Sequence, residues 1–250
     1  MNIPNFLCIG VCKAGTTILI KYLNLHPDIY CNSGEKHFFD KVPYTKNLSE
    51  EECKKYADWF KTEKKIVGEK TPSYCYLQFA VDRIHKYNPN MKLILILREP
   101  ISRAYSQYNM KLNKEKKYKE KSYMSEFNKE KNVKLSEITR NGDYYIVRGF
   151  YYEIIKYILS KFDRRNLYIC ISDEIIKNKE IEYNKIYKFL GASTRIKINK
   201  DLDVHKLKYK NKIPKDLEIM LYKIYKPHNE KLYELLGRKI DIWEKYYETI

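Results

Sequence analysis

The stretch FLCIGVCKAGTT at residues 6–17 decides the fold. Its apolar run, residues 6–11, predicts a buried parallel strand, and a turn containing Gly15 follows. Apolar residues then recur at helical spacing over residues 16–25. Because glycine permits unusual backbone angles and a helix N-terminus is partially positive, successive N–H groups in this turn can point at an anion. The stretch therefore predicts a strand, a phosphate-binding turn and a helix.

The rest of the chain continues this alternation. Further apolar runs predict strands over residues 65–68, 92–97 and 167–171. Apolar residues at helical spacing predict helices over residues 50–60, 76–87, 150–162, 186–190 and 217–225. Such alternation predicts an α/β class, with a P-loop-like three-layer fold in which helices flank a central parallel sheet. No repeat and no linker rich in Gly, Ser or Pro divides the chain, so we expect a single domain over residues 1–250.

The chain is strongly basic, with 49 Lys and Arg against 32 Asp and Glu, a net charge of +17. That surplus favours anionic partners, although a coding bias toward Lys, Asn, Ile and Tyr explains it equally well. The N-terminus has no basic segment before an apolar run, and no apolar stretch approaches bilayer length. We therefore expect a cytoplasmic protein without a membrane span. The six cysteines form no CxxC pair, which argues against a zinc site.

A basic stretch interrupts the pattern at residues 111–142. Its first part, residues 111–134, holds nine Lys and four Glu, so its net charge is 9 − 4 = +5, and apolar anchors are few. The composition favours a mobile, solvated insertion. The alternative is a basic lid over an anionic substrate.

The turn after the first strand departs from a Walker A loop. Residues 10–15 have the GxxxxG frame, but Lys13 lies inside the loop and Thr16 takes the position of the Walker lysine. Lys13 supplies a full positive charge, and Thr16 and Thr17 supply hydroxyl donors. An anion cradle is therefore expected, but its nucleotide is left open by these residues alone.

Two groups suited to a second phosphate follow the strand at residues 92–97. Arg98 comes directly after this strand, at the edge where parallel α/β sheets bind ligands. Ser106 falls about two turns into the next helix, which Pro100 is well placed to begin. An arginine fork and a nearby hydroxyl suit a terminal phosphate.

Three motifs resemble those of PAPS-dependent sulfotransferases, and the first two stand in the order in which that family has them. KAGTT (Lys13, Ala14, Gly15, Thr16 and Thr17) resembles the family's 5′-phosphosulfate loop, and LREPISRAYSQY is similar to its 3′-phosphate motif, with Arg98 and Ser106 at the matching positions. EKHFFD at residues 35–40 resembles the acidic motif of heparan sulfate sulfotransferases of the N-deacetylase/N-sulfotransferase and 3-O-sulfotransferase type. EKTPSY at residues 69–74 is similar to a segment beside the donor, and weaker likeness extends over nearly the whole chain.

The resemblance implies an enzyme that moves a sulfuryl group from PAPS to a hydroxyl or amine, releasing PAP, without a metal. It makes Glu35 the base and places His37 in the site. Lys13, with Lys70, would stabilise the leaving oxygen. The family's donor loop with its cysteine pair is not present as such at residues 205–212, where we expect Lys208 or Lys210 to replace its charges.

The acceptor expected from the resemblance is a glycan or another anionic or hydroxylated molecule, and a small alcohol or amine stays open. The first competing class is a small-molecule kinase with an atypical P-loop, which would need Mg²⁺ and an acidic ligand that the sequence does not place. The second is a basic nucleic-acid-binding protein, but no nucleic-acid-binding signature occurs, so no nucleic-acid partner is expected.

Overall fold

The computed structural model describes residues 3–41, 48–114, 122–194, 202 and 212–250. The chain divides into two compact units. The first unit comprises Met1–Leu97 and Tyr157–His205, and the second comprises Arg98–Lys156 and Lys206–Ile250.

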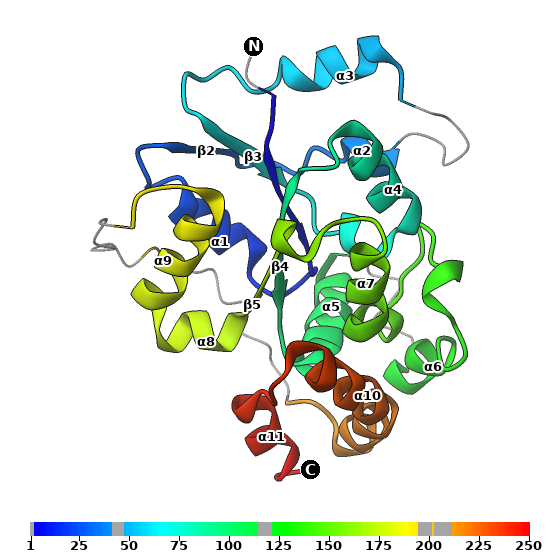
Figure 1. Ribbon diagram of the computed structural model, residues 1–250. Coiled ribbons are helices and arrows are strands. Elements are labelled where there is room, and N and C mark those ends of the chain that lie inside the picture. Colours follow the sequence, from blue (N-terminus) through cyan, green and yellow to red (C-terminus); the bar gives the residue numbers. More distant parts are fainter. Residues whose placement is uncertain (1–2, 42–47, 115–121, 195–201, 203–211) are drawn as a thin grey trace. The chain divides into compact units, whose positions relative to one another are not determined.

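The first unit is built on a five-stranded parallel sheet with strand order β2-β3-β1-β4-β5 (Figure 1). The strands are β1 (Phe6–Gly10), β2 (Ile29–Asn32), β3 (Ile66–Lys70), β4 (Lys92–Leu97) and β5 (Leu167–Ile171). Every residue of β1 and β3 is buried, as expected for apolar runs that are covered on both faces of a parallel sheet.

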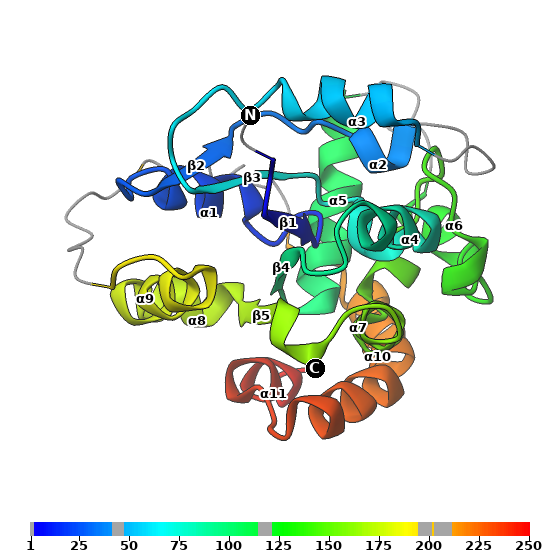
Figure 2. The same cartoon turned by 45° about the horizontal axis from the view of Figure 1, so that its top comes forward.

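Helices cover both faces of this sheet. They are α1 (Thr16–Leu23), α2 (Phe38–Lys41), α3 (Glu50–Ala57), α4 (Gln78–Tyr87), α8 (Ser172–Lys177) and α9 (Lys179–Leu190). Figures 1 and 2 show α1 and α9 on one side of the sheet, and α2 with α4 on the other. The rings of Tyr22 in α1 and Tyr183 in α9 lie 4.9 Å apart, and Arg83 of α4 donates to the Phe39 carbonyl of α2 at 3.0 Å. The expected three-layer α/β fold is confirmed.

The strands expected at residues 92–97 and 167–171 have the bounds that the sequence indicates. β3 ends two residues later than expected, at Lys70, and β1 ends one residue earlier, at Gly10. β2 was not expected from the sequence. It has only four residues, IYCN, at the edge of the sheet, and a run that short is too brief to show a periodic pattern.

The second unit is mainly helical. It contains α5 (Pro100–Lys114), α6 (Tyr123–Asn128), α10 (Lys215–Leu236) and α11 (Asp241–Tyr247), and α7 (Tyr151–Leu159) begins in it and ends in the first unit. Pro100 is the first residue of α5, as expected. Tyr225 of α10 is fully buried and donates to the Ile146 carbonyl at 2.9 Å, which ties α10 to the segment before α7.

The described part of the basic stretch at residues 111–142 is largely exposed but contains a few buried anchors. Phe127 is fully buried, and so is the carboxylate of Glu130, which accepts the N–H groups of Tyr145 and Ile146. The net charge of the stretch does not reveal these contacts. One buried phenylalanine and one buried hydrogen-bond acceptor are enough to hold the short helix α6 against the rest of the second unit. Residues 115–121 lie outside the described part of the chain.

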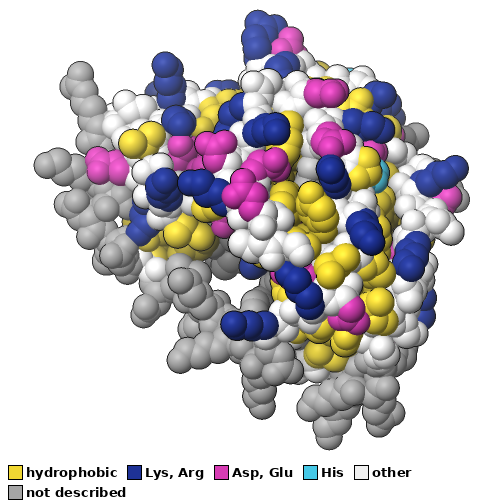
Figure 3. Space-filling view, turned by 90° about the horizontal axis from the view of Figure 1, so that it is seen from below, with side chains coloured by type: hydrophobic (Ala, Val, Ile, Leu, Met, Phe, Trp, Pro, Cys, Tyr) yellow, Lys and Arg dark blue, Asp and Glu magenta, His cyan; other side chains and the backbone are white. Residues whose placement is uncertain are grey.

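The surface charge is mixed where it can be seen. On the face drawn in Figure 3, Lys and Arg side chains are spread among acidic and apolar ones and are not gathered in one patch. Of the helices in the described ranges, none combines the length and the apolar character needed to cross a bilayer.

Gly68 tests the close packing at the centre of the sheet. A Cβ atom on Gly68 would lie 2.3 Å from the Phe6 carbonyl oxygen and 2.7 Å from the Phe6 ring, so β1 and β3 would have to move apart. We expect Gly68→Ala to lower the free energy of unfolding by roughly 1–3 kcal/mol or more, measured by urea denaturation. Gly34→Ala is the matched control, because its nearest neighbour is 3.8 Å away. Equal stability of the two variants would contradict this account of the β1–β3 packing.

Candidate active site

The carboxyl ends of three neighbouring strands bring the predicted catalytic segments to one edge of the first unit. β1 lies between β3 and β4, with Cys8 opposite Lys70, and the predicted phosphate-binding turn begins at Gly10, the last residue of β1. Asn32 at the end of β2 lies opposite Glu69, and Glu35 follows three residues after Asn32. The lysine at the end of β3 and the carboxylate after β2 therefore meet at the edge where parallel sheets bind their ligands.

The turn between β1 and α1 has the geometry of an anion cradle. Gly15 adopts a φ of 97° at the start of α1, and Lys13 also has a positive φ, 72°. No side chain caps α1, whereas Ser49 and Glu52 form a capping box on α3. The amide groups of the first turn of α1 therefore have no side-chain acceptor, a property that α1 shares with α4, α9 and α10. A bound phosphate or sulfate would supply that acceptor.

The side chains of this segment differ in exposure. Gly15 and Thr17 are exposed, Lys13 is half-buried, and Ala14 and Thr16 are buried. The predicted loop residues thus present backbone, one hydroxyl and one partly accessible ammonium group.

Glu35 lies in an ion-paired network. Lys70 Nζ donates to Glu35 Oε1 at 3.0 Å, and His37 Nε2 lies 3.3 Å from Glu35 Oε2. The Lys70 side chain is almost fully buried, whereas the Glu35 side chain is 41% exposed. The hydrogen bond from His37, followed by the hydrogen bond from Lys70, lowers the pKa of Glu35 to about 2. Glu35 is therefore a carboxylate at neutral pH, and part of it is open to solvent.

His37 is held from behind by Asp40, which the sequence analysis did not single out. His37 Nδ1 lies 3.0 Å from Asp40 Oδ2, and Asp40 is 2% exposed. The Ser73 hydroxyl donates to the same carboxylate, and the His37 N–H donates to Thr71 Oγ1 at 3.2 Å. Asp40 and then Glu35 raise the pKa of His37 to about 9, so its ring is a cation at neutral pH. The spacing His37-x-x-Asp40 is the signal that sequence reasoning missed.

A second set of buried groups fixes the segment that carries His37. Thr71 donates to Glu69 Oε2 at 2.8 Å, and the Tyr74 hydroxyl accepts the Phe38 N–H at 2.8 Å. Phe38 stacks on Tyr56 with ring centroids 4.2 Å apart. Burial raises the pKa of Glu69, which is fully enclosed, to about 7. Residues 69–74 therefore position the 35–40 segment through its backbone.

The predicted 3′-phosphate residues belong to the second unit. Arg98 is the first residue after β4 and is half-buried, and Ser106 lies in the second turn of α5 with 1% exposure. Lys208 and Lys210 lie outside the described residues. The structure thus brings together Glu35, His37 and Lys70.

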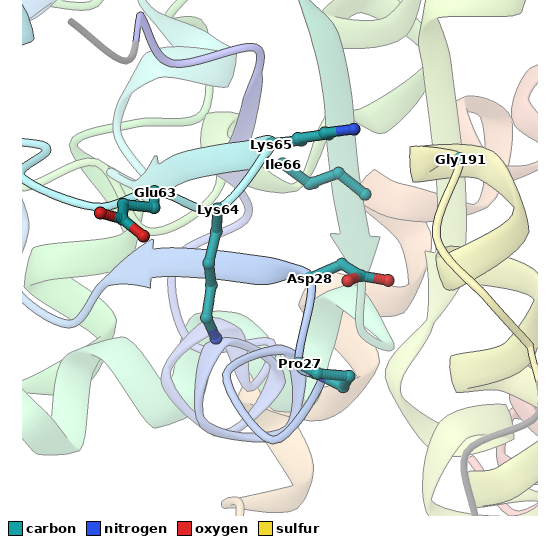
Figure 4. Close-up of a pocket in the computed structure, with 7 residues that line it drawn as sticks. All are labelled: Pro27, Asp28, Glu63, Lys64, Lys65, Ile66 and Gly191. Carbon is teal, nitrogen blue, oxygen red and sulfur yellow. The ribbon is translucent and has the colours of Figure 1, made fainter.

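A hollow of about 500 Å³ lies elsewhere on the first unit. It is lined by Pro27, Asp28, Glu63, Lys64, Lys65, Ile66 and Gly191 (Figure 4). Pro27 and Asp28 directly precede β2, and residues 63–65 directly precede β3, so the hollow is at the amino edge of the sheet, opposite the edge that carries Glu35 and Lys70. The Lys64 ammonium group donates to the His26 and Ile29 carbonyls at 3.2 and 2.9 Å, which is a structural role. We therefore place the candidate site at the carboxyl edge.

The parallel sheet, the anion cradle and the ionised carboxylate are those of a group-transfer enzyme with a P-loop-like fold. The family model described as Sulfotransferase domain matches residues 4–223. The chain therefore belongs to the sulfotransferase domain family, whose donor is PAPS and whose nucleotide product is PAP. This membership decides against the kinase class that the sequence had left open.

Individual relatives agree with this assignment. Heparan sulfate glucosamine 3-O-sulfotransferase 5 of Mus musculus is 28% identical over 267 residues, which cover 96% of this chain and 74% of the relative. Heparan sulfate glucosamine 3-O-sulfotransferase 6 of Mus musculus is 38% identical over 117 residues, 44% of this chain and 31% of the relative. The crystal structure of a sulfotransferase from Alicyclobacillus acidocaldarius has the same fold, with a TM-score of 0.79 and 23% identity, and the match covers 98% of this chain and 100% of that chain.

The contact between Asp40 and His37 can be tested through the pKa of the His37 ring. Asn in place of Asp40 removes the largest cause of the raised pKa of His37, so we expect that pKa to fall from about 9 toward 6.5. NMR titration of the His37 ring, assigned with His37→Gln, measures the change. Because folded His37 holds its proton more tightly than the unfolded chain, it stabilises the fold below about pH 6.5, and this contribution is lost as pH rises through about 9. A pKa still near 9 in Asp40→Asn would contradict the assigned pair.

Proposed function

We propose that this enzyme transfers the sulfuryl group of PAPS to a hydroxyl or amine of a carbohydrate, with Glu35 as the base. The observation that carries the proposal is the Glu35 carboxylate, held ionised and half-exposed between Lys70 and His37. The relatives named above act on a glucosamine residue of heparan sulfate, and this supports a glycan containing an amino sugar as the acceptor class.

The donor supplies an activated sulfuryl group attached to its 5′-phosphate. In this proposal the Lys13–Thr17 loop binds that end of the donor through the uncapped amides of α1, the Thr17 hydroxyl and the Lys13 ammonium group. Arg98 and Ser106 bind the 3′-phosphate, with Lys208 or Lys210 contributing charge. The family match runs without a break through both compact units, which supports one sulfotransferase domain over residues 1–250.

In this proposal the Lys70 ammonium group interacts with two groups in turn, the Glu35 carboxylate and the leaving oxygen of the donor. In the structure the ammonium group binds Glu35 at 3.0 Å, and the Lys70 side chain is 6% exposed. Together with Lys13, it stabilises the negative charge that develops on the leaving oxygen. As Lys70 turns toward this charge, its hold on Glu35 weakens and the pKa of Glu35 rises from about 2, so the carboxylate becomes a better base when it is needed.

His37 acts on the other oxygen of Glu35. Its protonated ring donates toward Glu35 Oε2, and Asp40 prevents the ring from turning. The remaining lone pairs of Glu35 then face the acceptor. Residues 111–142 remain a proposed basic lid, although their described part is more firmly packed than a solvated loop.

Glu35→Gln tests the base. The amide keeps the shape of the side chain but cannot take a proton, so we expect kcat to fall by roughly 10²- to 10⁴-fold while the Kd for PAP stays within about twofold. Steady-state kinetics and calorimetry measure the two quantities. Glu51→Gln, at an exposed glutamate of α3, is the matched control. Turnover at the wild-type rate in Glu35→Gln would remove Glu35 from the base role.

The acceptor class is tested with PAPS carrying a labelled sulfate. We expect label to enter oligosaccharides of the heparan type that contain glucosamine, because relatives named for that acceptor match most of the chain. Small alcohols and amines are offered in parallel at the same concentrations. Labelling of these alone would replace the glycan with a small acceptor and leave the sulfotransferase assignment intact.

A further inference from the structure

The turn that joins β4 to α5 in the second unit contains an unusual helix cap. Glu99 is 5% exposed, and its carboxylate accepts the N–H of Ile101 at 2.8 Å and the N–H of Ser102 at 2.6 Å. Its carbonyl accepts the Arg103 N–H at 2.9 Å, the first bond of the helix. Glu99 is therefore the N-cap of α5, a position that usually takes the shorter Ser, Thr, Asp or Asn. A longer cap needs further support to keep its place.

That support comes from the C-terminal helices. The Tyr247 hydroxyl, at the end of α11, donates to Glu99 Oε1 at 3.0 Å. Asn229 of α10, 4% exposed, donates to the same hydroxyl at 2.9 Å, which directs the Tyr247 proton toward Glu99. Three residues far apart in the sequence thus form one hydrogen-bonded chain that ends on the cap of α5.

The same helix supports the residue before the cap. The Arg98 carbonyl accepts a hydrogen bond from the Tyr151 hydroxyl at 2.7 Å, and Tyr151 is 1% exposed. The Tyr151 ring lies 6.0 Å from the ring of Trp243 in α11, which is also 1% exposed. Helix α11 therefore supports both residues of the Arg98–Glu99 turn. It contacts Glu99 directly through Tyr247, and it supports Arg98 indirectly, because Trp243 packs near Tyr151.

The cap changes how a phosphate can bind here. Glu99 occupies the N–H groups of Ile101 and Ser102, so an anion near α5 must be held by side chains and not by helix amides. The affinity for that anion then depends on where the backbone places the Arg98 side chain. A loosened turn would weaken this one contact and leave the rest of the nucleotide site unchanged.

We infer that α11 is a positioning element for the 3′-phosphate contact of the donor, with Tyr247 and Asn229 as positioning residues for Arg98. The inference rests on the proposed role of Arg98 and Ser106. Asn229, Trp243 and Tyr247 all follow residue 223, where the family match ends. They therefore lie beyond the part of the chain that the family model covers.

The experiment compares two nucleotides by calorimetry on the full chain: PAP, and 5′-AMP, which lacks the 3′-phosphate. In Tyr247→Phe we expect the Kd for PAP to rise roughly tenfold, the effect of losing one hydrogen bond to a charged group, and the Kd for 5′-AMP to stay unchanged. In kinetics, KM for PAPS should rise while kcat at saturating PAPS is kept. Tyr246→Phe is the matched control, because this neighbouring hydroxyl donates to Glu218 and not to Glu99.

Glu99→Gln provides a second variant, since its amide has one acceptor oxygen and can serve only one of the Ile101 and Ser102 N–H groups, and the same selective loss of PAP affinity is expected. If Tyr247→Phe does not fold, the Kd values for PAP and 5′-AMP are compared in Glu99→Gln instead. An unchanged preference for PAP over 5′-AMP, or equal loss of both, overturns the inference. If wild-type protein itself shows no preference for PAP, or Arg98→Ala does not reduce it, the proposed phosphate role of Arg98 fails, and the inference fails with it.

Discussion

The parallel pairing of β1 with its two neighbours is the constraint on which the site depends. Because Cys8 lies opposite Lys70, the end of β3 and the turn after β1 emerge at the same edge of the sheet. Asn32 opposite Glu69 brings the segment of Glu35 to that edge as well. A shift of register by one residue would turn Lys70 to the opposite face of the sheet, away from Glu35. The close approach at Gly68 is one of the contacts that exclude such a shift.

Within this frame, the site is built from charges that restrain one another. Glu35 and Asp40 flank His37, and Lys70 balances Glu35 from the other side. The pKa of Glu35 and the pKa of His37 are each shifted by neighbours within this network, so the protonation state of one residue depends on the others. Beneath this network, burial outweighs the hydrogen bonds that Glu69 receives and raises the pKa of its carboxyl group to about 7. The hydrogen bonds that Glu69 receives serve to orient Thr71, and through it the backbone of His37.

The sequence predicted the fold where patterns are long or chemically distinct. β4 and β5 stand out because buried parallel strands are continuous apolar runs, and the turn after β1 stands out because it contains Gly15, which adopts a positive φ. The sequence does not predict β2, because a strand of four residues is too short to show an alternating hydrophobic pattern. It does not predict the burial of Phe127 either, because this residue lies in a stretch dominated by lysines. Glu35, His37 and Lys70 came from motif resemblance, whereas Asp40 and the Glu99 cap emerge only from distances between side chains.

The two helix starts that follow β1 and β4 are treated in opposite ways. The first turn of α1 has no side-chain cap, and the first turn of α5 is sealed by the chain's own carboxylate. The start of α5 therefore offers neither the Ile101 nor the Ser102 N–H group to an outside anion, because Glu99 already accepts both. Loss of that carboxylate would strand two donors of the first turn, and the helix would begin to fray from Pro100 onward.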